Sequence, residues 1–297
     1  MKKEGPGMKK WTPPQRADVY SMLEVYDMNT NQREVVAEFD RVIEAPNWTP
    51  DGQSLVYNSL GRIYRFDLDS RESRLIDTGY VASCNNDHVL SPDGKLLGIS
   101  AWTAEDQKSR VYILPITGGT PRLITPVGPS YLHGWSPDGK TLAYCGNRDG
   151  IFDVYVLPAE GGVETQLTDA PGLNDGPEYS PDGGHIWFNS VRTGLMQVWR
   201  MNPDGSEQTQ MTRDEGWNSW FPHVSPDGRD VVYICYKKGD VDPGAHPPDK
   251  NVEIRHMPAS GGAPRTLAKF FGGQGSLNVN SWAPDSRRFA FVSYRLK

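Results

Sequence analysis

The sequence predicts an all-β fold, a six-bladed β-propeller with four antiparallel strands in each blade. The first observation is a recurring turn, in which a strand-like run ends in Pro-Asp and then Gly or Ser. Its prolines are Pro50, Pro92, Pro137, Pro181, Pro226 and Pro284. They lie 42, 45, 44, 45 and 58 residues apart, and a period in the forties built from short β runs is typical of one propeller blade per repeat. The second observation is that the chain begins and ends in the middle of a repeat.

Each repeat predicts two hairpins, with strands A to D. Within residues 136–139, proline presets φ for the first central position of a turn, and glycine takes the left-handed position that closes it. The run before each turn is strand A, and apolar or aromatic runs such as residues 142–144 and 186–188 follow the turns as strand B. Strands C and D follow, around a Gly-Gly or Asp-Gly turn. In the last copy Ser286 replaces the glycine, so we expect this turn to be the most strained or the most different.

The two chain ends predict how the ring closes. Residues 23–26 and 33–36 form a C–D pair before any Pro-Asp turn, and residues 279–282 and 289–292 form an A–B pair with nothing after it. The halves complement each other, so the last blade is expected to combine N-terminal strands C–D with C-terminal strands A–B. An open solenoid, the alternative, leaves strand edges exposed. We expect a flexible tail over residues 1–16 and a single propeller domain over 17–297.

The repeat resembles a known family. Trp135-Ser136-Pro137-Asp138-Gly139, an apolar strand, Val-Tyr and then Leu-Thr are similar to the TolB-type propeller repeat, itself a relative of the WD repeat. The resemblance covers roughly residues 22–295 and implies the fold; the same fold hosts unrelated functions. Periplasmic TolB carries a secretion signal and an extra N-terminal domain. Neither is visible here, so the resemblance implies a relationship of repeats rather than of cellular role.

Composition limits the partners. A net charge of −6 and a pI near 5.6 argue against nucleic acid as a main partner. No segment is apolar enough for a membrane span or a signal peptide, so we expect a cytoplasmic monomer that contacts no membrane. Cys84, Cys145 and Cys235 are sparse and odd in number, which suits a reducing compartment and core packing.

Reactive side chains gather where the chain enters the A strands, around one mouth of the central channel. The candidate ligand-binding residues there are Asp87, His88, Tyr131, His133, Asp175, Glu178, Trp220, His223, Asn278 and Asn280. Aromatic and polar groups on a concave surface suit a protein or peptide, or a small polar ligand. We therefore expect a non-catalytic binding propeller without a cofactor. For Trp220, packing between blades is the competing interpretation.

A metal-dependent enzyme is the alternative. His88, His133 and His223 with nearby carboxylates could hold one divalent Mn or Zn ion, and Glu178 could be a ligand or a base. Such a site would support a lyase or hydrolase acting on a carbohydrate-like anion; some pectin-oligosaccharide lyases are propellers that resemble this arrangement. The competing interpretation is that these histidines bond neighbouring backbone. No nucleophile elbow and no phosphate-binding glycine motif occurs.

One insertion, residues 239–249, accounts for the longest spacing between turns. It joins strands B and C of the fifth complete repeat, so it lies on the same face as the loops that lead into the A strands. It could fold over the channel mouth as a lid or extend into solvent. Its Pro and Asp content favours the disordered state.

Overall fold

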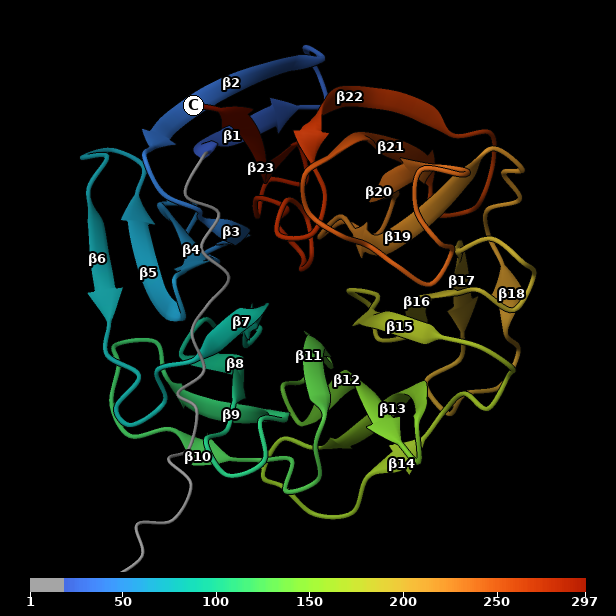
Figure 1. Cartoon of the computed structure of the whole chain (residues 1–297), viewed down its shortest axis with the longest axis horizontal. Coiled ribbons are helices and arrows are strands. Elements are labelled where there is room, and N and C mark those ends of the chain that lie inside the picture. The colour runs from blue at the N-terminus through green and yellow to red at the C-terminus, as the bar shows by residue number, and fades with distance from the viewer. Residues whose placement is uncertain (1–18) are drawn as a thin grey trace, which may run out of the picture.

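The structure is a computed structural model that describes residues 19–297. Its six sheets are arranged as blades around a central axis, with the first strand of each four-stranded blade innermost (Figure 1). The all-β six-bladed propeller is thereby confirmed. No helix in the described part of the chain could span a membrane. The tail expected at residues 1–16 lies outside the described residues.

Five blades are four-stranded meanders and the sixth is built from both ends of the described chain. Blade 1 contains β3 (Glu44–Trp48), β4 (Ser54–Ser59), β5 (Arg62–Asp67) and β6 (Ser73–Ile76). Blade 2 contains β7 (Cys84–Leu90), β8 (Leu96–Trp102), β9 (Ser109–Pro115) and β10 (Arg122–Leu123). Blade 3 contains β11 (Ser130–Trp135), β12 (Thr141–Arg148), β13 (Ile151–Pro158) and β14 (Thr165–Gln166).

The remaining blades complete the ring. Blade 4 contains β15 (Asn174–Tyr179), β16 (Ile186–Ser190), β17 (Gln197–Met201) and β18 (Thr209–Gln210). Blade 5 contains β19 (Trp217–Val224), β20 (Asp230–Lys237), β21 (Lys250–Pro258) and β22 (Arg265–Gly272). Blade 6 pairs β2 (Gln32–Phe39), β1 (Val19–Asp27) and β23 (Arg288–Leu296) in that order.

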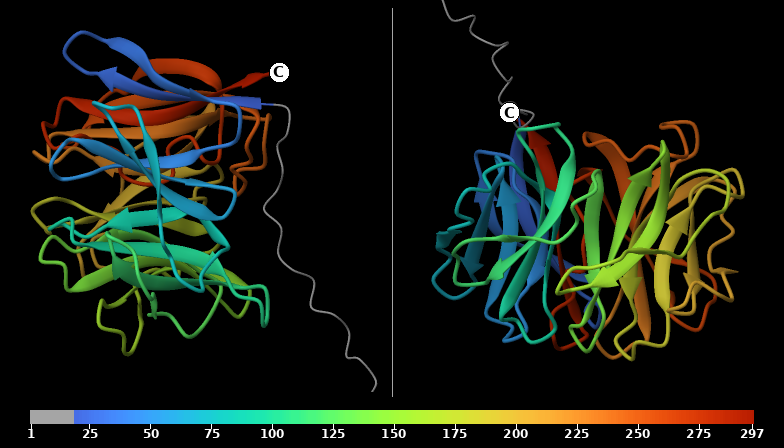
Figure 2. Two further views of the ribbon diagram at one scale, coloured as in Figure 1. Left: turned by 90° about the vertical axis from the view of Figure 1, so that its left-hand side faces the viewer. Right: turned by 90° about the horizontal axis from the view of Figure 1, so that it is seen from below.

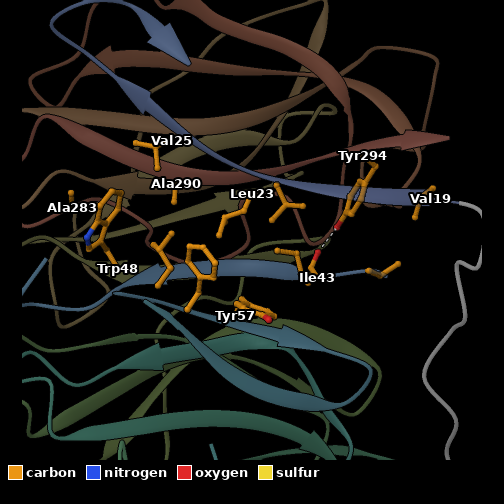
Figure 3. Close-up of a cluster of buried hydrophobic side chains, with 13 residues drawn as sticks. Val19, Leu23, Val25, Ile43, Trp48, Tyr57, Ala283, Ala290 and Tyr294 are labelled. Atoms are coloured by element: carbon orange, nitrogen blue, oxygen red, sulfur yellow. Dashed lines mark hydrogen bonds between the residues drawn. The ribbon is translucent and has the colours of Figure 1, made fainter. Parts of the chain in front are cut away.

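Ring closure follows the sequence prediction. β1 pairs with β23 in an antiparallel register that runs from Val19 opposite Leu296 to Asp27 opposite Arg288, and the first and last coloured strands lie side by side in both views of Figure 2. A buried cluster then joins blade 6 to blade 1. Figure 3 shows Leu23 facing Ile43 and Tyr57, with the Tyr294 hydroxyl donating to the Ile43 carbonyl at 3.1 Å.

The innermost strand of blade 6 differs from the prediction. Residues 279–282 were expected to form a strand, but they make only one isolated bridge, Trp282 to Phe289. The polar side chains of this segment take the backbone partners instead. The Asn280 side-chain oxygen accepts from the Trp282 N–H at 3.0 Å, and that of Asn278 accepts from Gly275 at 2.6 Å. Such local bonds compete with a strand ladder.

The Pro-Asp-Gly turns fold as predicted and also connect neighbouring blades. Gly139 has φ +72° and donates its N–H to the Ser136 carbonyl at 2.8 Å. Four of these glycines face a turn proline of the preceding blade, and the first closes the ring because Gly52 faces Pro284. In the last copy Ser286 adopts the same left-handed region, with φ +57°. This conformation is costly for a residue with a Cβ, so the expected strain at that turn is confirmed.

Two alanine substitutions distinguish the cost of backbone strain within a turn from the cost of disturbing the contact between turns of neighbouring blades. Gly228→Ala should lower the free energy of unfolding by about 1 kcal/mol through its positive φ alone, because nothing lies within 4 Å of the added Cβ. Gly94→Ala should cost roughly 1 kcal/mol more, because its Cβ would lie 3.0 Å from Pro50 Cγ. Urea unfolding of both variants measures the difference, and equal losses would contradict a contact between the turns.

Candidate functional site

A cavity of about 600 Å³ lies over the channel mouth, at the face where the chain enters the inner strands. Inner strands supply Glu44, Asp87, His133, Asp175 and Phe221 to its wall. The second and third strands of blades 1 to 3, with the connections between them, supply other lining residues, and these include Leu60, Gly61, Trp102 and Phe152. We call this space the rim cavity. Its volume is within the range of small-molecule sites.

A β-bulge in each inner strand sets which side chains reach the rim cavity. The strand register shifts between Asp175 and Glu178 in β15, between Cys84 and His88 in β7, and at corresponding places in the other three blades. Bulges re-aim side chains and are common beside functional sites. Here the inner-strand residues before or within the bulge line the cavity, and those that follow it lie deeper in the channel.

The β15 bulge depends on glycine. Gly176 has φ +62°, and a Cβ there would lie 2.6 Å from the side-chain oxygen of Asn189 and 2.9 Å from the Phe221 ring. The Gly176 N–H donates to Asp175 Oδ1 at 2.7 Å. This bond holds the Asp175 carboxylate at the cavity wall, so the bulge fixes an acidic group of the site.

Asp175 and His133 form a buried pair from neighbouring blades. His133 Nε2 lies 3.3 Å from Asp175 Oδ1, and the imidazole stacks on Phe221 with ring centroids 5.5 Å apart. Burial alone would lower the pKa of His133, but the hydrogen bond to Asp175 and the nearby carboxylates raise it. For Asp175, burial acts to raise the pKa, and His133 outweighs it, so the pKa is lowered. The pairing therefore favours the protonated imidazolium form of His133 and the ionised carboxylate form of Asp175.

Asp87 is the exceptional acid of the site. It is 6% exposed, and within residues 19–297 its carboxylate accepts no protein hydrogen bond that meets ordinary geometry, although its backbone N–H donates to Asn85 Oδ1 at 3.0 Å. Burial raises the pKa of Asp87 to about 7; the charge of Asp175 adds to this and that of His133 opposes it. A buried carboxyl with a displaced pKa in a cavity is a candidate binding or proton-transfer group.

Residues 239–249 fold over the cavity, so the lid alternative holds and the disordered one is wrong. Gly244, His246 and Pro248 line the cavity from this side. The His246 ring lies 4.3 Å from the Trp220 ring and 5.1 Å from that of Phe221, between centroids. Tyr236 donates its hydroxyl to the Pro247 carbonyl at 3.1 Å. Burial lowers the pKa of His246 to about 4, so this ring is neutral at pH 7.

Four predicted site residues, His88, Glu178, His223 and Asn280, join with Asn47 in a separate structure, which we call the channel network. His88 Nδ1 lies 2.9 Å from Asn47 Oδ1, and Asn47 Nδ2 donates to the Asn280 carbonyl at 2.6 Å. Asn280 Nδ2 in turn donates to Glu178 Oε1 at 2.7 Å. Glu178 Oε2 lies 2.7 Å from His223 Nδ1. The channel network therefore links five of the six blades below the rim cavity.

The structure thus divides the ten predicted site residues. Asp87, Tyr131, His133 and Asp175 line the rim cavity. His88, Glu178, His223 and Asn280 belong to the channel network. Trp220 is fully buried beneath the lid, where it contacts Phe221 and His246. Asn278 is also buried and shapes the turn at Gly275.

Comparison with known proteins agrees with the repeat pattern. A family model described as the TolB beta propeller domain matches residues 90–253. The chain belongs to this TolB propeller family. An uncharacterized protein of Agrobacterium fabrum is 49% identical over 275 residues, which cover 92% of each chain. A solved structure of a "putative TolB" from Agrobacterium tumefaciens has 48% identity and a TM-score of 0.90, and the match covers 94% of this chain and 99% of that one.

The lyase likeness is more distant. An oligogalacturonate lyase solved in complex with manganese is 15% identical, with a TM-score of 0.53, over 88% of this chain and 72% of that one. Such a match shows the fold alone. In this TolB-family propeller the three candidate metal-binding histidines have different partners, and residues 19–297 contain no group of three His, Cys, Asp or Glu side chains placed to hold a metal. His223 in particular engages both ring nitrogens, with Glu178 and with the Leu277 carbonyl.

The cysteines of this TolB-family chain are buried and unpaired. Burial raises the pKa of the Cys84 thiol to about 12, and that of Cys145, which also lines the cavity, well above its ordinary value. Neither is available as a thiolate nucleophile near neutral pH. Core packing, as the sequence predicted, is therefore the role that the structure gives them.

Sequence reasoning missed several cavity residues. Glu44 and Asp175 stand six positions before their turn prolines and Phe221 five, whereas Glu178 and His223 stand three before. Distance from the proline was therefore only a partial signal of depth, because His133 and His88 both stand four before their prolines and only His133 lines the cavity. Trp102 ends β8 and Phe152 lies near the start of β13, so both stand next to the connection between the second and third strands of their blades. That connection lies on the same face as the lid, so these aromatic residues were also within reach of the sequence.

Proposed function

We propose that this TolB-family propeller is a non-catalytic binding protein that holds a small polar ligand, or the end of a peptide, in the rim cavity. The observation that carries the proposal is the cavity itself. Its aromatic walls, Trp102, Tyr131, Phe152 and Phe221, alternate with buried polar groups beneath a folded lid. Largely apolar cavities with a few placed polar groups are the usual form of ligand sites. A volume near 600 Å³ admits a small molecule or one or two residues of a peptide.

Ligand-observed NMR with a mixture of small polar metabolites and short peptides tests this function. Trp102→Ala removes one aromatic wall, and Tyr80→Ala is the matched control because Tyr80 is an exposed aromatic residue outside the cavity lining. We expect at least one compound whose binding is lost in Trp102→Ala and kept in Tyr80→Ala. Compounds that bind all three proteins equally, or none that binds the wild type, would contradict the proposal.

The enzyme alternative receives no support from the cavity. Glu44, Asp87 and Asp175 are among the lining residues, which include no Lys and no Arg from the described part of the chain, residues 19–297. A carbohydrate-like anion would therefore meet like charges rather than the cationic groups that anion recognition requires. We also propose that no metal is needed, as the sequence predicted. A monomeric state and a cytoplasmic location stay predictions, and sedimentation and fractionation would measure them.

Elemental analysis of tag-free protein checks the metal prediction. We expect no stoichiometric manganese or zinc, because the two nitrogens of His223 are already engaged and His88 donates or accepts within the channel network. The comparison protein is a His88→Ala/His133→Ala double variant. About one metal per chain in the wild type, lost in the double variant, would overturn the non-catalytic proposal.

A further inference from the structure

The charge balance of the rim cavity says more about its ligand than its shape does. The carboxylic acids and histidines that line the cavity are Glu44, Asp87, Asp175, His133 and His246. His133 and Asp175 pair with each other, and the pKa of His246 is lowered to about 4, so its ring carries no charge near neutral pH. The cavity is therefore negative once Asp87 ionises. Apart from His133, which is paired with Asp175, no cationic side chain within residues 19–297 lines the cavity. We therefore expect the charge that compensates Asp87 to come from the ligand.

Asp87 is the group that lacks a partner. It is more than nine-tenths buried, lines the cavity and accepts no protein hydrogen bond among the described residues. Burying an ionised carboxylate is costly unless it is paired. A ligand that brings an ammonium group to this carboxylate would supply both the opposite charge and the missing hydrogen-bond donors.

Three aromatic rings, those of Trp102, Tyr131 and Phe152, line the same cavity as Asp87. The Trp102 and Tyr131 rings are 6.3 Å apart and edge-on, and the Tyr131 and Phe152 rings are 6.4 Å apart, between centroids. Burial raises the pKa of the Tyr131 hydroxyl, and the negative charge of Asp87 adds to this, so the two side chains are close enough to interact. Aromatic faces attract cations, and a set of such rings beside a carboxylate is the usual composition of an amine site.

We propose that the rim cavity selects a ligand with a cationic amine, whose ammonium group pairs with Asp87 against the wall formed by Trp102, Tyr131 and Phe152. The inference rests on the proposed binding function and narrows its ligand class. It applies equally to a free amine and to the amino group of a peptide. His133 and Asp175 then act as the neutral pair that positions Phe221 at the cavity wall.

Three probes of matched shape test the selection: benzylamine, benzyl alcohol and benzoate, titrated against the wild type by NMR or calorimetry. We expect benzylamine to bind at least tenfold more tightly than benzyl alcohol, with benzoate the weakest. Asp87→Asn should abolish the preference for the amine. Glu160→Gln removes one acidic group whose side chain is 93% exposed, and it should leave the preference unchanged.

The pH dependence gives a second readout. Benzylamine stays protonated between pH 6 and pH 8, while Asp87, with a pKa of about 7, changes from mostly neutral to mostly ionised. Affinity should therefore rise by about tenfold over this range. The groups that face Asp87 across the cavity either change the affinity in the same direction or keep their charge. His133, whose pKa is raised, also favours a cationic ligand once it loses its proton. Asp175 stays ionised and His246 stays neutral over this pH range. The other ionisable lining residues are Glu44, Cys84, Tyr131 and Cys145.

The outcomes separate the two proposals. Binding of benzyl alcohol or benzoate as tightly as benzylamine, with loss of that binding in Trp102→Ala, would overturn the amine selection and keep the rim cavity as a ligand site. A preference for benzylamine that survives Asp87→Asn would also overturn it. Binding of none of the three probes at millimolar concentration would overturn both.

Discussion

Glu178→Ala is expected to lower the free energy of unfolding by about 3–5 kcal/mol, the range found when one partner of a buried charged network is removed. Glu178 is 6% exposed and accepts from three groups. Its Oε1 receives the Val224 N–H at 2.9 Å and Asn280 Nδ2 at 2.7 Å, and its Oε2 lies 2.7 Å from His223 Nδ1. Alanine leaves all three without this partner. Urea unfolding monitored by tryptophan fluorescence measures the loss.

Glu178→Gln is the matched control. Glutamine keeps one side-chain carbonyl oxygen for Val224 and Asn280 and replaces the other oxygen with an N–H₂ group, so the loss should fall to roughly 1–3 kcal/mol. Because these partners belong to blades 5 and 6, the defect lies where blades meet at the channel. A loss below about 1 kcal/mol in Glu178→Ala would show that the channel network does not hold the blades together. Binding in the rim cavity should be retained in whatever fraction of the variant stays folded.

The fold was predictable because the sequence repeats its turn chemistry. Each Pro-Asp-Gly copy specifies one hairpin locally, and the half repeats at the two ends specify the joined blade. The exception is the segment at residues 279–282, whose apolar and aromatic residues resemble a strand. Its Asn and Ser side chains bond the backbone locally, and that competition depends on geometry that a pattern of residue types does not record.

The site was predictable only as a group of inner-strand positions. Reading the six loops together placed Asp87, Tyr131, His133 and Asp175 correctly at the channel mouth. It could not separate them from His88, Glu178 and His223, because the separation is made by β-bulges that shift the register by one or two residues. Bulges of this kind depend on packing across blades, as the approach of Phe221 to Gly176 illustrates. The lid was the less favoured alternative for a similar reason. The Pro and Asp content of residues 239–249 favoured disorder, and residue types alone do not record the contact of His246 with Trp220.

Asp87→Asn is expected to stabilise the protein, and to do so more at high pH. The folded-state pKa of Asp87 is raised from 3.8 to about 7 by burial, so the wild type loses stability as the pH rises from about 4 to 7, where the unfolded chain gives up a proton that the folded chain retains. Above pH 7 the penalty approaches ~4 kcal/mol. The lost attraction between Asp87 and His133 reduces the gain from asparagine, so we expect about 2–4 kcal/mol at pH 8 and roughly 1 kcal/mol at pH 4.5.

Urea midpoints of the wild type, Asp87→Asn and Glu160→Gln at pH 4.5 and pH 8 measure this difference. Glu160→Gln controls for net charge, because the exposed Glu160 side chain should change stability little at either pH. A gain in Asp87→Asn that is equal at both pH values would mean that the Asp87 carboxylate ionises normally in the folded protein. A larger gain at pH 8 than at pH 4.5 would instead show that the Asp87 carboxylate lowers the stability of the folded protein when it ionises. Such a cost is common where a buried group serves binding, because the ligand supplies the partner that the chain omits.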